Sequence, residues 1–178
     1  MSERWLTACH EAGHAVACLM RGGGTFTSVT IERTDDYLGC TFTRLKQWDS
    51  QFVSYAGPWA EARAQWPSDL SVGELDDDGG EFNDYIVFAL AANPPDLQGY
   101  REPTGEIAIA IRKALERDCG DETIRQMDVA RDEIWDRQLE DMWPVMLSVA
   151  QMLIDGQAVN DEVVRSLIDE RLRVLLEE

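Results

Sequence analysis

The stretch that decides the fold reads ERWLTACHEAGHAVACLMRGGG and runs from Glu3 to Gly24. It predicts a helix over about Glu3 to Met20, because apolar side chains recur there at helical spacing, namely Leu6, Cys9, Val16, Leu19 and Met20. The glycines that follow, residues 22–24, are a strong stop signal for a helix.

Two alternating stretches follow this helix and predict a β-hairpin. Apolar and polar residues alternate from Phe26 to Arg33 and again from Leu38 to Leu45. The residues between them include Thr34, Asp35 and Asp36, which favour a turn.

Helical patterns return after the hairpin. A helix is expected from about Gln51 to Trp66, with a break or kink at Pro58. An acidic loop, GELDDDGGE at 73–81, leads to a helix from about Phe82 to Ala92. Asn93-Pro94-Pro95 is expected to end that helix.

Three or four further helices are expected from about Pro103 onward. Gly120, Pro144 and Gly156 are expected to separate them, and Asn160 is a good N-cap for the last one. The whole order predicts an α+β, mostly α fold, in which a first helix, a β-hairpin or small sheet and a helical bundle follow one another. The 178 residues fit a single domain, with residues 1–92 as one half and 103–178 as the C-terminal helices.

Composition narrows the class of protein. Apolar residues make up 44% and charged residues 28%, which is a globular balance. The net charge is -18, from 16 basic and 34 acidic side chains. Such a surface repels phosphate backbones and anionic bilayers, so neither nucleic acid nor a membrane is an expected partner.

The chain also lacks the usual export signals. No apolar segment of signal-peptide type opens it, and the longest apolar stretch, Met142 to Ile154, is too short to span a bilayer. Its four cysteines include no C-x-x-C pair. We therefore expect a cytoplasmic protein with reduced thiols.

The chemistry lies in the only two histidines, His10 and His14. Residues four apart share one face of a helix, so both imidazoles can hold one cation, and zinc is the expected metal. Glu11 points partly aside, which suits a base acting on a water held by the metal. This H-E-x-x-H pattern predicts a zinc metallopeptidase.

Gly13 supports this interpretation, because a glycine inside a helix usually has a packing reason. We expect it to let another backbone, such as the hairpin, come close to the metal helix.

The third protein ligand is open from the residues alone. No third histidine exists, so a carboxylate or a cysteine is needed. Cys9 points about 100° away from His10 around the helix and is more readily a core residue. The acidic candidates cluster around the loop and are Glu74, Asp76, Asp77, Asp78, Glu81 and Asp84.

At this point the sequence resembles the peptidase domain of the FtsH-type zinc metallopeptidase family. The resemblance follows the family's order in five segments, which are HEAGHAVA at 10–17, SVTIER with LGCT at 28–41, YAGPWAEA at 55–62, GEFND at 80–84 and VNDEVVRSLID at 159–169. It implies that His10, His14 and Asp84 bind Zn²⁺ and that Glu11 is the catalytic base. Family members carry a membrane anchor and an AAA ATPase module before the peptidase. Here the motif begins at residue 10 and no phosphate-loop string G-x-x-x-x-G-K-[ST] occurs, so ATP-independent action is expected.

The expected substrate is a peptide or an unfolded protein segment. A second hypothesis is a non-catalytic, zinc-binding domain of the same type that binds a partner or regulates one, and the six tryptophans would suit a binding surface. A third is an H-E-x-x-H peptidase of the regulator-cleaving kind with another third ligand. A homo-oligomer or a separate ATPase partner is compatible with each.

Overall fold

The structure is a computed structural model that describes residues 1–21, 24–32, 39–44, 49–102 and 105–177. It confirms the expected mostly helical fold with one small sheet. In chain order the elements are α1 (Glu3–Met20), β1 (Thr25–Thr30), β2 (Cys40–Arg44), α2 (Ser50–Gln65), α3 (Phe82–Ala92), α4 (Pro94–Arg101), α5 (Glu106–Asp118), α6 (Asp121–Ile154) and α7 (Asp161–Glu177).

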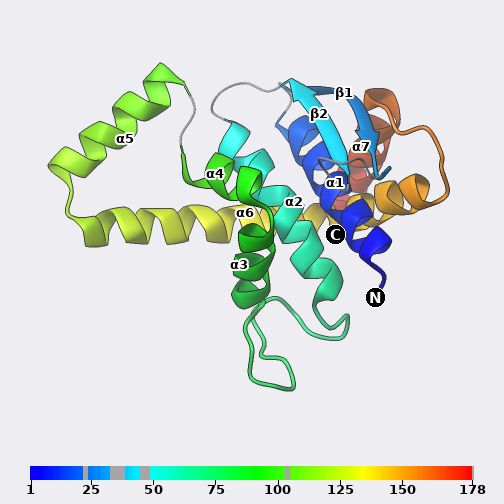
Figure 1. Ribbon diagram of the computed structural model, residues 1–178, viewed down its shortest axis with the longest axis horizontal. Helices are drawn as coiled ribbons and strands as arrows, with labels where there is room; N and C mark the ends of the chain where they lie inside the picture. The colour runs from blue at the N-terminus through cyan, green and yellow to red at the C-terminus, as the bar shows by residue number, and fades with distance from the viewer. Residues whose placement is uncertain (22–23, 33–38, 45–48, 103–104, 178) are drawn as a thin grey trace.

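Helix α1 is the centre of the molecule. The Ser2 side chain caps it by accepting a hydrogen bond from Trp5 N at 3.3 Å. From Ala8 to Leu19 almost every residue is buried, as expected for a helix covered on several sides. It packs against α2 and α6, and the hairpin and α7 also contact it (Figure 1).

Gly13 permits the closest of these contacts. A Cβ at this position would overlap the Ala56 carbonyl oxygen and lie 2.9 Å from Ala60 Cβ. The expectation of a close-approaching backbone is therefore confirmed, but the partner is α2 rather than the hairpin.

Strands β1 and β2 form a two-stranded antiparallel sheet, so the hairpin prediction is confirmed. The register pairs Phe26 with Thr43 and Thr30 with Cys40, with an irregularity between Phe26 and Ser28. The strands are shorter than the sequence pattern suggests, and the predicted turn at 34–36 lies outside the described residues.

Two prolines expected to break helices do not do so. Helix α2 continues through Pro58 and α6 continues through Pro144. A proline removes one backbone hydrogen bond, and packing can offset that loss. Pro58 is fully buried beside Trp59, and the exposed Pro144 is followed by the buried pair Val145 and Met146.

The segment Asn93-Pro94-Pro95 ends α3 as predicted, but it also begins a helix that was not predicted. Proline fits the first helical turn, where its missing N–H has no intrahelical acceptor anyway. Helix α4 therefore starts at Pro94 and packs against α2.

One apolar core runs from Ala8 to Ile168 and joins α1 and α2 with the C-terminal α6 and α7. Trp59, Trp66 and Trp135 are buried in it, so these tryptophans serve packing, while Trp48 lies outside the described residues. Helix α5 stands away from the core on the end of α6 (Figure 1). Among the described helices, none has the length and apolar character needed to cross a bilayer.

Candidate metal centre

His10 and His14 project from one face of α1 toward α2 and α4. Their Nε2 atoms lie 3.1 Å apart, and the rings meet edge to face. His10 is only 7% exposed, although it is a polar residue in the core. The spacing of four residues therefore brings the two imidazoles together as the sequence predicts.

Asp96, in the first turn of α4, completes the group. Its Oδ2 atom lies 3.0 Å from His10 Nε2 and 3.4 Å from His14 Nε2. Within the described parts of the chain, these three residues form the only cluster suited to hold a metal ion.

Hydrogen bonds behind the rings fix which nitrogens face the cluster. The Val53 carbonyl oxygen lies 2.8 Å from His14 Nδ1, and a carbonyl can only accept, so His14 Nδ1 carries the proton. The Glu61 carboxylate holds His10 Nδ1 in the same way at 3.1 Å. In its neutral form each ring presents a lone pair on Nε2 to the cluster, as metal-bound histidines do.

The donor set fits a zinc ion. Two imidazole lone pairs and one carboxylate oxygen are all acceptors, so they repel one another at these distances unless a cation or a proton lies between them. For zinc bonds of about 2.0–2.1 Å in tetrahedral geometry, neighbouring ligand atoms are about 3.3 Å apart. The three observed separations, 3.0, 3.1 and 3.4 Å, are close to that value.

The charges of the site favour a cation as well. Burial alone lowers the pKa of His10, but hydrogen bonds to Asp96 and Glu61 outweigh it and raise that pKa to about 10. Burial opposes ionisation of Asp96, yet the two histidines hold the pKa of that carboxyl well below its usual range. The pocket thus strongly prefers positive charge beside an ionised Asp96.

Asp84, which the family resemblance implies as third ligand, is placed elsewhere. It is exposed in the first turn of α3, where its Oδ2 accepts a hydrogen bond from Glu81 N at 3.1 Å in a capping box. It does not belong to the metal-holding group, and neither do Glu74, Asp76, Asp77, Asp78 and Glu81. The structure therefore brings Asp96, and not Asp84, to the histidines.

Cys9 is also outside the group, as expected. It is fully buried in the core, and burial together with the nearby Glu61 charge raises the pKa of its thiol to about 12. It is therefore a packing residue in thiol form.

Glu11 lies next to the cluster and is 5% exposed. Its Oε2 accepts a hydrogen bond of 2.6 Å from the hydroxyl of Thr41 on β2. Gly39 comes so close that a Cβ there would lie 3.0 Å from the other oxygen, Oε1. The carboxylate is thus held between α1 and the start of β2.

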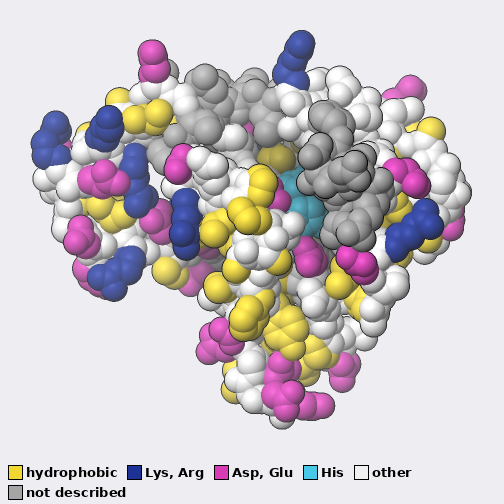
Figure 2. Space-filling view, viewed as in Figure 1, with side chains coloured by type: hydrophobic (Ala, Val, Ile, Leu, Met, Phe, Trp, Pro, Cys, Tyr) yellow, Lys and Arg dark blue, Asp and Glu magenta, His cyan; other side chains and the backbone are white. Residues whose placement is uncertain are grey.

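These groups open into a cleft of about 710 Å³. Its walls come from the N-terminal part of α1, from Gly39 and Thr41, from Glu61 of α2, and from residues 92–96 at the end of α3 and the start of α4. Figure 2 shows histidine in a hollow near the centre of this face, with acidic side chains beside it. The candidate ligands and Glu11 can therefore meet a molecule from solvent.

Gly57 of α2 forms the floor behind the histidines. A Cβ there would overlap the His14 ring and lie 2.9 Å from His10 Nε2. Only glycine leaves both rings in place, so the A-G-P segment of α2 is part of the site.

Further from the cleft, Tyr55 of α2 donates a hydrogen bond of 2.7 Å to Asp136 of α6. Burial is the main cause that raises the pKa of Asp136 to about 6, and the nearby negative charges of Asp132 and Glu133 raise it further. The hydrogen bond from Tyr55 lowers this pKa but does not offset the other effects. Ionisation of the Asp136 carboxyl group is therefore less favourable in the folded protein than in water.

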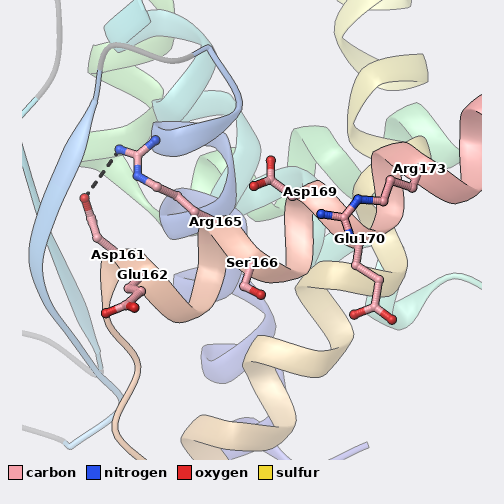
Figure 3. A pocket seen from close by; sticks show the side chains of 7 residues that line it. All are labelled: Asp161, Glu162, Arg165, Ser166, Asp169, Glu170 and Arg173. Atoms are coloured by element: carbon pink, nitrogen blue, oxygen red, sulfur yellow. Dashed lines mark hydrogen bonds and ion pairs between the residues drawn. The ribbon is translucent and has the colours of Figure 1, made fainter.

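A second pocket, of about 570 Å³, lies along α7 and lacks such chemistry (Figure 3). Arg165 in it is already engaged with Asp161 at 3.4 Å and with the Gly24 carbonyl at 2.9 Å. Its lining contains no histidine or cysteine and consists of Asp161, Glu162, Arg165, Ser166, Asp169, Glu170 and Arg173.

No role in the site was assigned from the sequence to Asp96, Glu61 or Thr41, nor to Val53, Gly57 and Gly39. Asp96 had a usable signal, because Pro-Pro-Asp after Asn93 has proline at the first helical position and an acid in the first turn, both typical of a helix start. Glu61 and Thr41 meet α1 only through tertiary packing. Both lie in segments that carry the family resemblance, 55–62 and 28–41, but that resemblance gave neither residue a role.

Comparison with protein-family models and with curated proteins finds no match for this chain.

Proposed function

We propose that this chain is a zinc-dependent peptidase that hydrolyses peptide bonds in peptides or unfolded protein segments without ATP. The observation that carries the proposal is the convergence of His10 Nε2, His14 Nε2 and Asp96 Oδ2 in an open cleft beside Glu11. The resemblance of residues 10–17 to the FtsH-type metal helix supports the same class.

His10, His14 and Asp96 would hold the metal, with Asp96 in the place that the resemblance gives to Asp84. These three residues line the cleft, and three protein ligands beside an open position are typical of catalytic rather than structural zinc sites. A zinc ion held there would supply Lewis acidity, which polarises a carbonyl and makes a water more acidic.

Side chains of this protein carry out the proton transfers and hold the histidines in place. Glu11 takes one proton from water as the water oxygen bonds to the substrate carbonyl carbon, and it returns that proton to the nitrogen as the C–N bond breaks. Glu61 and the Val53 carbonyl keep both histidines in the tautomer that leaves Nε2 free.

A catalytic centre that lies inside a cleft limits the substrate, because the substrate backbone must enter the cleft to reach it. A stable folded protein exposes its backbone only in rare open states, whereas an unfolded chain can enter the cleft directly. We therefore expect cleavage of an unfolded protein such as casein, and none of stable folded domains, with or without ATP.

The test compares the wild type with Glu11→Gln, both with measured zinc content. We expect equal zinc, near one per chain, and cleavage by the wild type alone. Equal cleavage by both proteins would point to a contaminating protease, and a wild type without stoichiometric zinc would remove the basis of the proposal.

One observation favours the non-catalytic alternative. Val87 and Phe88 on α3 are 53% and 74% exposed. Other apolar side chains on α5 and α6 are exposed as well. Exposed apolar surfaces are typical of contacts with other proteins. Full zinc occupancy without cleavage of any unfolded substrate would support a partner-binding or regulatory domain instead.

A further inference from the structure

The start of β2 touches the residue proposed as the base, and this contact has no role in metal binding. Thr41 Oγ1 lies 2.6 Å from Glu11 Oε2 and 3.2 Å from the Glu11 backbone oxygen. A hydroxyl has one proton to donate, and the shorter distance goes to the carboxylate. A length of 2.6 Å is typical of a charge-assisted hydrogen bond.

Gly39 lies beside the same side chain and leaves room for it. A Cβ on Gly39 would lie 2.9 Å from Glu11 Cγ and 3.0 Å from Glu11 Oε1, and 2.7 Å from Thr7 Cγ2. The backbone of residue 39 therefore fits against the Glu11 side chain only because it is glycine.

The two carboxylate oxygens of Glu11 differ in their hydrogen bonding. Oε2 is occupied by the Thr41 hydroxyl, while Oε1 has no hydrogen bond to any residue that the structure describes. Gly39, Thr41 and Glu11 all line the cleft that holds the histidines. The free oxygen is thus the one available to a water in that cleft.

We infer that Thr41 is a positioning residue, which holds Glu11 Oε2 so that Oε1 is presented to the water that the peptidase reaction consumes. This inference rests on the proposed function. A base must lie within hydrogen-bond reach of the proton it takes, and a carboxylate free to rotate would spend much of its time out of reach. Thr41 is not one of the three residues proposed to hold the metal, so it would act through Glu11.

The test uses zinc-loaded, full-length Thr41→Val and Thr41→Ser, with Thr43→Val as a control two residues along β2. Valine keeps the shape of threonine but removes the hydroxyl, and serine keeps the hydroxyl. We expect Thr41→Val to lower kcat about 10-fold or more, because it removes a hydrogen bond to a charged group, with KM within about twofold. Thr41→Ser should recover kcat to within about threefold of the wild type, Thr43→Val should match the wild type, and zinc content should be unchanged in all.

A second measurement reports on the contact without using activity. In a double-mutant cycle of Thr41→Val and Glu11→Gln, we expect the Tm loss of the double variant to be smaller than the sum of the single losses. Two outcomes would overturn the inference and show that Thr41 is only a structural residue. One is coupling in the cycle with an unchanged kcat in Thr41→Val. The other is an equal loss of kcat in Thr41→Ser and Thr41→Val.

The two proposals fail in different ways. If the wild type cleaves, Glu11→Gln does not, and Thr41→Val equals the wild type, only the positioning role is wrong. If the wild type and Glu11→Gln behave alike, the peptidase proposal fails and the positioning role fails with it, whatever the cycle shows.

Discussion

Removing the Asp96 carboxylate should distinguish the candidate metal site of this fold from the site that the family resemblance implies. In Asp96→Ala the two histidines remain, but the oxygen 3.0 and 3.4 Å from their Nε2 atoms is gone. Loss of a residue behind a metal ligand already weakens binding about 10–100-fold, so loss of a ligand should exceed about 100-fold. At saturating zinc that factor removes about 2.7 kcal/mol of metal-dependent stabilisation.

The chain offers a closely matched control for this change. Asp84 and Asp96 each occupy the third position of a helix, in α3 and α4. Asp84→Ala removes a capping contact, which is expected to cost about 0.5–2 kcal/mol of stability, while zinc affinity stays within about twofold. Both variants therefore perturb a helix start, and only Asp96→Ala removes a ligand.

The assay is zinc titration combined with thermal unfolding of each variant with and without zinc. For a chain of this length about 2.7 kcal/mol corresponds to roughly 5–11 °C, so the zinc-dependent part of the Tm should shrink by that amount in Asp96→Ala and not in Asp84→Ala. If instead Asp84→Ala loses zinc and Asp96→Ala keeps it, the family's ligand is the right one and our reasoning from the α4 geometry is wrong.

The sequence was sufficient for the parts of the site that depend on local geometry. Helix α1 spans Glu3–Met20 as its apolar spacing predicts, and the juxtaposition of His10 and His14 follows from helical pitch alone. Asn160 caps α7 as expected, by accepting a hydrogen bond from Val163 N at 3.0 Å. In each case the cause lies within a few residues of its effect.

The candidate third ligand does not meet that condition, because Asp96 is 86 positions from His10 along the chain. Asn93-Pro94-Pro95 carries two signals at once, a stop for the preceding helix and a start for the next, and the stop alone does not predict α4. Asp84 satisfied the motif, but an acid at the third helical position is equally suited to a capping box. Which of two such carboxylates reaches the histidines is decided by how α3 and α4 pack on α2, which no local pattern specifies.

Two further predictions test the packing around the site. Gly57→Ala places a methyl group against His14 and His10, so zinc affinity should fall about 10-fold or more. The matched control is Gly73→Ala, which meets nothing within 4 Å and should bind zinc normally in the same titration. The other prediction concerns Asp136, whose pKa burial raises to about 6, above its ordinary value of 3.8. The folded state therefore binds more protons than the unfolded state between these values, so the contribution of Asp136 to stability is full below about pH 4 and is lost as pH rises through about 6. Two pKa units correspond to about 3 kcal/mol, and partial solvent exposure reduces the expected loss to about 1–2 kcal/mol. Asp136→Asn should thus gain stability relative to the wild type as pH rises from 4 to 8 in urea unfolding, since its amide stays neutral and can still accept the Tyr55 hydrogen bond. A difference between the two proteins that does not change with pH would show that Asp136 titrates normally in the fold.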